Sequence, residues 1–191
     1  MKTILKLASI SLLVLLFVLH QAKGKKLIDD PELSIEVPVL IDPSVFLYQA
    51  GDIFLGGQPT EKTLDTLFGI GVTLIINIRT NQEVMTHNIE GYHEEDYARE
   101  IGLDYIQIPI GGDAGFTPEA IARIDQAIQK AGGKVLIHCR SAGRATLAWM
   151  AWLVRYRDYN IDEAVELGKK GQFSFPLEDL LGYPVTIKKA E

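Results

Sequence analysis

The chain has 191 residues, of which 47% are apolar, and it carries a formal net charge of −6. That length suits one domain with its own core, and two domains of ordinary size would be crowded. The excess of acidic residues argues against binding to nucleic acid or to anionic lipid surfaces. We therefore expect any bound anion to be held locally, by a few arginines and backbone amides.

Residues 1–24 have the pattern of a secretory signal peptide. Two lysines precede an uncharged, mostly apolar run of thirteen residues from Leu7 to Leu19, and small residues follow up to Gly24. The alternative is an uncleaved membrane anchor, although this run is shorter than the ~20 residues that span a bilayer. Cleavage would remove three of the 19 basic residues and no acidic one, which leaves 16 against 25 and a net charge of −9. We expect an exported protein, periplasmic or secreted, with no stable membrane association after cleavage.

We expect three parts after the signal peptide. Residues 25–44 contain three prolines and predict an extended N-terminal lead-in. Residues 45–175 alternate strand and helix patterns without an internal repeat, which predicts a single domain. Residues 176–191 are expected to form a C-terminal tail.

The elements of the domain follow from their apolar periodicity. The expected strands are one or two within residues 44–58, then 72–79, 103–110 and 134–139. The expected helices are 59–71, 92–102, 117–133, 143–159 and 161–171. The first of these helices has Leu64, Leu67 and Phe68 on one face, and Thr117 caps the third. This alternation predicts an α/β fold, with a mainly parallel central sheet flanked by helices on both faces.

The working surface of such a sheet lies at the carboxyl ends of its strands. Three segments are expected there: NIRTNQE, PIGGDAGFT and CRSAGR. The third holds the only cysteine of the chain, Cys139, which therefore cannot form an internal disulfide. Lone cysteines are usually small buried hydrophobes. Here, however, a strand, a glycine-containing turn and a helix start predict a nest of backbone N–H groups for an oxyanion, formed by Arg140, Ser141, Ala142 and Gly143.

Cys139 and Arg144 are the candidate catalytic pair. The helix N-terminus and the arginine favour a cysteine thiolate, which is a nucleophile. The Arg144 guanidinium lies far enough round the turn to hold two oxygens of a bound anion. We expect His138 behind the loop, where it orders the cysteine region. Ser141 and Thr146 are both candidate hydroxyl donors to the sulfur, and the spacing does not choose between them.

The segment VLIHCRSAGRATLAWMAWLVRY resembles the signature of cysteine-dependent protein phosphatases, in particular the small bacterial dual-specificity-like group. Upstream, GGQPTEKTLDTLFGIGVTLIINIR resembles the opening of the same group, so the resemblance covers about residues 45–158. It implies a phosphotyrosine phosphatase II type fold. It also implies a reaction in which Cys139 attacks phosphorus and water then hydrolyses the phosphocysteine. The implied substrates are phosphorylated proteins or small phosphoesters, and no metal or cofactor is needed.

The resemblance also implies an aspartate that protonates the leaving group from a loop before the cysteine. Asp113 is the candidate, 26 residues before Cys139, and a turn aspartate beside two glycines is the alternative. Arg79 follows a buried strand toward the same sheet edge. It is a candidate for shaping the substrate pocket, with a surface ion pair as the alternative.

Two other functions stay open. Four residues separate Cys139 from Arg144, one fewer than in the larger tyrosine phosphatases, and CRSAGRA also resembles the loop of rhodanese sulfurtransferases, where the cysteine carries a persulfide. An inactive phosphatase-like module that binds an anion or a partner protein is the third alternative. A metal site at His87 and His93 is not expected, because a spacing of six does not place both on one helical face.

Overall fold

The computed structural model describes residues 33–171 and 177–185. The predicted signal peptide and residues 25–32 of the predicted lead-in lie outside the described residues.

Six strands form one sheet, in the order β1-β2-β3-β6-β4-β5. Their bounds are β1 Val39–Asp42, β2 Leu47–Ala50, β3 Ile53–Gly56, β4 Val72–Asn77, β5 Asp104–Gln107 and β6 Lys134–His138. Strands β3, β6, β4 and β5 run parallel, whereas β1 and β2 pair antiparallel at one edge. The predicted α/β fold with a mainly parallel sheet is confirmed. The sheet begins within the segment predicted as a lead-in.

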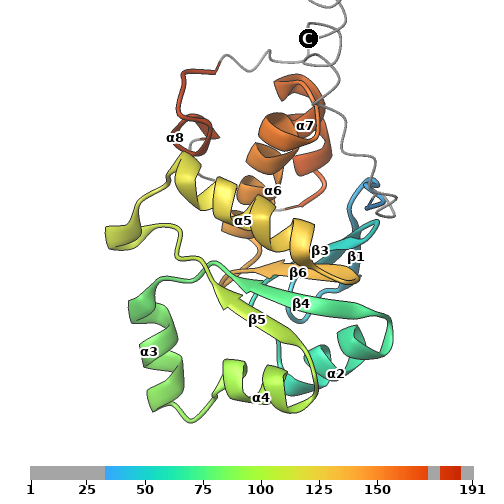
Figure 1. Cartoon of the computed structure of the whole chain (residues 1–191), viewed down its shortest axis with the longest axis vertical. Helices are drawn as coiled ribbons and strands as arrows, with labels where there is room; N and C mark the ends of the chain where they lie inside the picture. The colour runs from blue at the N-terminus through green and yellow to red at the C-terminus, as the bar shows by residue number, and fades with distance from the viewer. Residues whose placement is uncertain (1–32, 172–176, 186–191) are drawn as a thin grey trace, which may run out of the picture. The chain divides into compact units, whose positions relative to one another are not determined.

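Helices cover both faces of the sheet (Figure 1). One face carries α5 Pro118–Lys130, α6 Gly143–Tyr156, α7 Ile161–Gly168 and α8 Leu177–Leu181, and the other carries α2 Glu61–Gly69 and α4 Glu94–Glu100. The alternation along β6 serves both layers. Val135 and Ile137 join the core cluster of α5 and α6, and Leu136 joins that of α2 and α4. The continuous apolar run of this strand therefore reflects burial on both faces.

The most deeply buried helix of the described chain is α6. Ten of its 14 residues are buried, and it packs against α5, α7 and α8. Trp152 donates a hydrogen bond from Nε1 to Asp125 of α5 over 2.9 Å. Burial on all sides fixes the start of α6, which directly follows the cysteine turn.

Two helices were not predicted from the sequence, namely α8 and α3, Asn81–Ile89.

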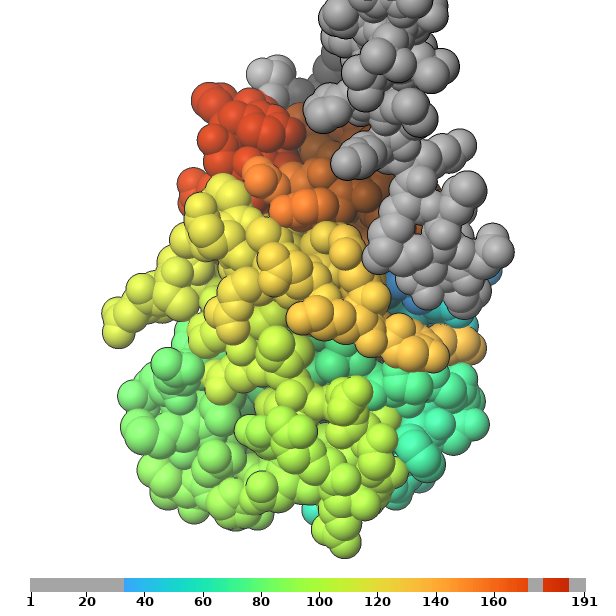
Figure 2. All heavy atoms as spheres, in the orientation of Figure 1, coloured from blue at the N-terminus to red at the C-terminus, as the bar shows by residue number. Residues whose placement is uncertain are grey.

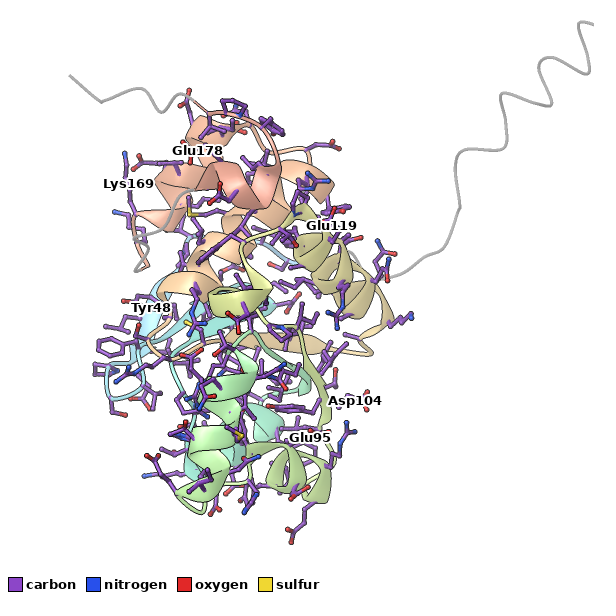
Figure 3. The ribbon with its side chains drawn as sticks, turned by 90° about the vertical axis from the view of Figure 1, so that its left-hand side faces the viewer. Tyr48, Glu95, Asp104, Glu119, Lys169 and Glu178 are labelled. Atoms are coloured by element: carbon purple, nitrogen blue, oxygen red, sulfur yellow. The ribbon has the colours of Figure 1, made fainter. Side chains whose placement is uncertain are left out.

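Helix α3 is held at its N-terminus by polar contacts. It begins with a capping box: Thr80 Oγ1 accepts from Glu83 N over 3.2 Å, and Glu83 Oε2 accepts from Thr80 N over 2.8 Å. None of its residues is buried, and Ile89 is 80% exposed. Figure 2 shows α3 and α4 at the end of this face opposite to α8, and Figure 3 views the molecule from the side of α3.

Two further details differ from the predictions. Phe68 is 49% exposed, so only Leu64 and Leu67 of the predicted α2 face are buried. In the predicted tail, the three leucines of α8 are buried against α5 and α6, so the beginning of the tail belongs to the core. None of the helices in the described ranges is long and apolar enough to cross a membrane.

Candidate active site

The cysteine turn joins the end of β6 to the start of α6. Cys139 N donates to Gly56 O over 3.1 Å, and Gln58 N donates to Arg140 O over 3.2 Å, so the end of β3 supports the turn from one side. Ala142 takes the left-handed conformation, with φ 65°, just before Gly143 opens the helix. An alanine is strained in this region, and such strain persists only where the surrounding structure enforces it.

Cys139 lies at the floor of this turn and is 1% exposed. It precedes a helix of 14 residues, whose positive dipole end favours negative charge at the turn. The predicted nest residues, Arg140 to Gly143, therefore connect the buried Cys139 to the N-terminus of α6. The structure places Cys139 in the apolar core, directly before the turn that leads into the N-terminus of α6.

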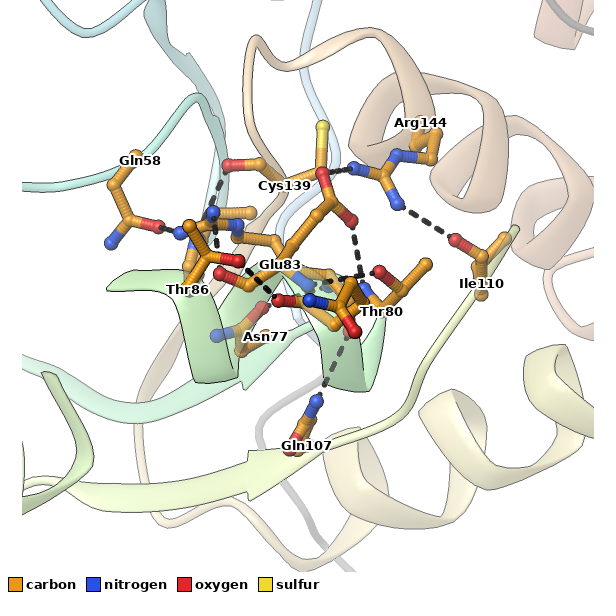
Figure 4. A network of polar contacts seen from close by, with 12 residues as sticks. Gln58, Asn77, Thr80, Glu83, Thr86, Gln107, Ile110, Cys139 and Arg144 are labelled. Atoms are coloured by element: carbon orange, nitrogen blue, oxygen red, sulfur yellow. Dashed lines mark hydrogen bonds and ion pairs between the residues drawn. The ribbon is translucent and has the colours of Figure 1, made fainter. Parts of the chain in front are cut away.

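Arg144 is held by two contacts on elements remote in sequence (Figure 4). Its Nη1 donates to Ile110 O over 2.8 Å, and its Nη2 donates to Glu83 Oε1 over 2.6 Å. A guanidinium has five N–H donors, so donors remain for an anion beside Cys139. The predicted clamp is thus positioned in advance by the strand end after β5 and by α3.

Glu83 is the main electrostatic partner of Arg144. Burial raises the pKa of this carboxyl, but the hydrogen bonds from Arg144 and from the Thr80 backbone lower it to about 2. Glu83 therefore stays ionised at neutral pH, caps α3 with one oxygen and pairs with Arg144 through the other. One side chain couples the placement of α3 to that of the clamp.

Arg79 is buried and already engaged. Its Nη1 donates to Gln58 Oε1, and its Nη2 donates to Glu83 O over 3.0 Å. Its Nε has no hydrogen-bond partner in the described chain. Arg79 links the segment after β3 to the first turn of α3, and its predicted role in shaping a substrate pocket stays a prediction.

His138 lies behind the turn and is fully buried. Its Nε2 is 2.7 Å from Glu94 Oε1, and Gln58 Nε2 donates to Glu94 Oε2 over 2.6 Å. Burial raises the pKa of Glu94, but its contacts with His138 and Gln58 outweigh that effect and lower it. His138 is therefore oriented by a buried carboxylate of α4, which gives the predicted ordering role a definite partner.

The remaining predicted residues are less constrained. Asp113 lies on the short 3-10 turn η1, Gly112–Ala114, with an exposed side chain that forms no hydrogen bond or ion pair to another described residue. Ser141 is exposed and pairs through its backbone with Gly57. Thr146 is buried, and its hydroxyl has no partner in the described chain. Asp113 follows Ile110 on the strand end that holds Arg144, so it lies on a loop anchored at the site.

The segment that contains the cysteine turn matches a known protein family. The family described as the beta-lactamase hydrolase-like protein, phosphatase-like domain, matches residues 58–153, about half of the 191 residues. The chain belongs to this family of phosphatase-like domains. The matched range contains Gln58, Arg79, Glu83, Glu94 and the whole cysteine turn.

One curated relative extends the comparison. Human dual specificity protein phosphatase 9 is 26% identical over 147 residues, which cover 74% of this chain and 35% of that protein. The chain thus spans about a third of the length of the curated relative that it matches.

Solved structures support the phosphatase-like fold. Tk-PTP in its active form is 21% identical and aligns with a TM-score of 0.57 over 74% of this chain and 99% of its own. A variant of Pseudomonas aeruginosa TpbA, solved in complex with pTyr, is 15% identical and aligns with a TM-score of 0.54 over 81% of this chain and 87% of its own. At these identities the likeness shows the fold alone. The predicted phosphatase-like fold is confirmed.

Three site residues of this phosphatase-like domain were not found from the sequence: Gln58, Glu83 and Glu94. A signal existed for two of them, since Gln58 lies in the GGQPT segment that carries the family resemblance, and Thr80 and Glu83 have the spacing of a capping box. No local pattern marks Glu94, whose partner His138 lies on another element. Within the described ranges, no group of three His, Cys, Asp or Glu side chains is placed to hold a metal ion.

Proposed function

We propose that this phosphatase-like domain hydrolyses phosphate monoesters through a phosphocysteine intermediate on Cys139. The observation that carries the proposal is the turn itself. Cys139 and Arg144 stand at its two ends, between a central parallel strand and a buried helix N-terminus, in a chain that belongs to a phosphatase-like family.

The proposed first step is displacement at phosphorus. The Cys139 thiolate forms the S–P bond while the P–O bond to the leaving group breaks, and the leaving oxygen takes a proton from Asp113. The turn amides and Arg144 hold the non-bridging oxygens, where charge accumulates in the transition state. In the second step water attacks phosphorus, its proton passes to the Asp113 carboxylate, and the S–P bond breaks to release phosphate and the thiolate.

Purified protein and an aryl phosphate test this proposal. We expect hydrolysis by the wild-type chain and none above background with Cys139→Ser. Asp113→Asn should lower kcat by about 10²–10⁴-fold. That loss should be smaller for a phenol of low pKa, which leaves without a proton. A phosphate adduct on Cys139, detected by mass spectrometry after rapid quenching, would identify the intermediate.

Sulfur transfer is the second candidate, favoured by the four residues between Cys139 and Arg144. Thiosulfate and cyanide, with thiocyanate as the measured product, test it on the same protein sample. An added sulfur atom on Cys139 together with no aryl phosphate hydrolysis would reject the phosphatase proposal. Absence of both activities would favour an inactive module that binds an anion or a partner.

The proposed substrates are phosphorylated proteins or small phosphoesters, and pTyr is bound by the TpbA variant named above. We also propose export, from the pattern of residues 1–24 alone. N-terminal sequencing of the mature protein tests that location, and retention of Met1 on an unprocessed chain would contradict it.

A further inference from the structure

A groove leads away from the cysteine turn along α3. It consists of two adjoining pockets that share Gln58 and His87. One pocket, of about 480 Å³, reaches Arg140 of the turn, and the other, of about 470 Å³, reaches Lys62 and Tyr92. We call the two together the α3 groove. Its walls are α3 and the segment from Gln58 to the start of α2.

The α3 groove starts where a substrate must leave the catalytic turn. Arg140 directly follows Cys139 and is exposed. The part of a substrate that extends beyond a phosphoryl group on Cys139 can therefore pass beside the Arg140 side chain. In Figure 4, Gln58 and Thr86 lie on the far side of Glu83 from Arg144. The groove therefore reaches the cysteine turn at Arg140, and Arg144 lies outside its lining.

The two ends of the α3 groove differ in chemistry. At the end away from the turn, the half-buried Tyr92 ring offers apolar surface beside the buried Pro59, and Tyr92 contacts His87 edge to face, with ring centroids 5.5 Å apart. The charged lining residues are balanced in sign over the whole groove: Lys62, Arg79 and Arg140 against Glu61, Glu83 and Glu90. Such a groove selects for shape and an apolar anchor rather than for a highly charged ligand.

The size of the α3 groove exceeds the needs of a single phosphorylated side chain. Each pocket alone lies within the range of about 300–1,000 Å³ that holds a whole small ligand. An extended polypeptide advances about 3.3–3.6 Å per residue, so several residues are needed to follow two such pockets. The outer wall of the α3 groove is formed by a helix that has no buried residue.

We propose that the α3 groove binds the polypeptide flanking a phosphorylated residue, with an apolar side chain of that polypeptide against the Tyr92 ring. This proposal rests on the proposed phosphatase function and narrows its substrate class to phosphorylated polypeptides. Thr86, exposed on the groove side of α3, is a specificity-determining residue in this arrangement.

Thr86→Trp fills the groove, and Ile89→Trp is the matched control, because Ile89 lies on the same helix but does not line either pocket. The measured quantity is the ratio of kcat/KM for a phosphotyrosine heptapeptide with a leucine beside the phosphotyrosine to kcat/KM for an aryl phosphate. We expect Thr86→Trp to lower this ratio about tenfold, which corresponds to about 1.4 kcal/mol. We expect Ile89→Trp to leave the ratio unchanged.

A binding measurement separates this proposal from the proposed function. Fluorescence anisotropy of the labelled heptapeptide on Cys139→Ser protein should show binding that Thr86→Trp weakens and Ile89→Trp does not. If wild-type protein fails to hydrolyse aryl phosphate but this binding pattern holds, the phosphatase proposal fails and the groove stands.

Two results would overturn the groove proposal. One is an equal effect of Thr86→Trp and Ile89→Trp, or no effect of Thr86→Trp, in both the kinetic ratio and the binding. The other is a Thr86→Trp loss that appears with a short-chain phosphoinositide and not with the heptapeptide, which would assign the groove to a lipid headgroup.

Discussion

The two helices that flank the cysteine turn are held by opposite means. Burial holds α6, since ten of its 14 residues are inaccessible to solvent. Polar contacts hold α3, which buries none of its residues and is fixed by Thr80, Glu83 and Arg79. The helix that follows Cys139 is therefore held mainly by apolar packing, and the helix that lines the α3 groove is held mainly by polar contacts. The two helices are nevertheless linked, because Glu83 of α3 pairs with Arg144 of α6.

The largest expected effect is loss of the packing that holds α6. Trp149 is fully buried, so Trp149→Ala should lower the free energy of unfolding by about 3–5 kcal/mol. Trp149→Phe is the control, because Trp149 Nε1 has no hydrogen-bond partner in the described chain and phenylalanine refills most of the space. Urea denaturation measures both. A loss below about 1 kcal/mol in Trp149→Ala would contradict the idea that burial holds α6.

The next effect concerns the clamp on α6. Arg144→Lys should lower kcat/KM for an aryl phosphate by about 10²–10³-fold, because lysine lacks the planar fork that holds two phosphate oxygens. Arg155→Lys is the control on the same helix, where Arg155 donates to Leu181 O over 2.6 Å, away from the turn. Steady-state kinetics measures both variants. Wild-type kcat/KM in Arg144→Lys as well as in Arg155→Lys would contradict the proposed role of Arg144 in holding phosphate oxygens.

A smaller effect tests the polar contacts of α3. Glu83→Gln removes the charge that pairs with Arg144 and weakens the capping box, and it should cost about 1–2 kcal/mol of unfolding free energy at neutral pH. Glu163→Gln in α7 is the matched control, because Glu163 completes a capping box with Asn160 on an exposed surface. Glu83→Gln should therefore cost more than Glu163→Gln. Equal losses of unfolding free energy in the two variants would mean that Glu83 stabilises the fold only through its capping box and not through its pair with Arg144.

The pKa of Glu83 sets the pH dependence of that comparison. It is lowered from 4.5 to about 2 in the folded chain, so the ionised carboxylate stabilises the fold above about pH 4.5. That contribution is lost as the pH falls toward 2. The stability difference between wild type and Glu83→Gln should be constant between about pH 5 and 8 and should shrink below that range. Urea denaturation at several pH values measures it, and a difference that grows on acidification would show the opposite sign.

The smallest expected effect is on the exposed face of α3. Ile89→Ser should change the free energy of unfolding by no more than about 0.5 kcal/mol, because the Ile89 side chain is 80% exposed. A larger loss, measured in the same denaturation experiment, would mean that α3 is held by apolar contacts after all.

The sequence by itself determined the alternation of strands and helices and the turn from Cys139 to Arg144. Both depend on local patterns: apolar periodicity over a few residues, and a short segment between a buried strand and a buried helix. The family resemblance added a fold that the structure confirms. The roles of Cys139, Arg144 and Asp113 stay predictions until activity is measured.

Only the tertiary structure decided what surrounds the turn. Glu83 lies 61 residues before Arg144 in the sequence. Glu94 of α4 contacts His138, which lies at the end of β6. The helix α3 has no apolar stripe, so the periodicity that predicted five of the other helices was missing there. Burial leaves a repeating trace along a sequence because each buried element needs an apolar face. A single ion pair between distant elements leaves none, because either partner alone has the pattern of a solvated charge.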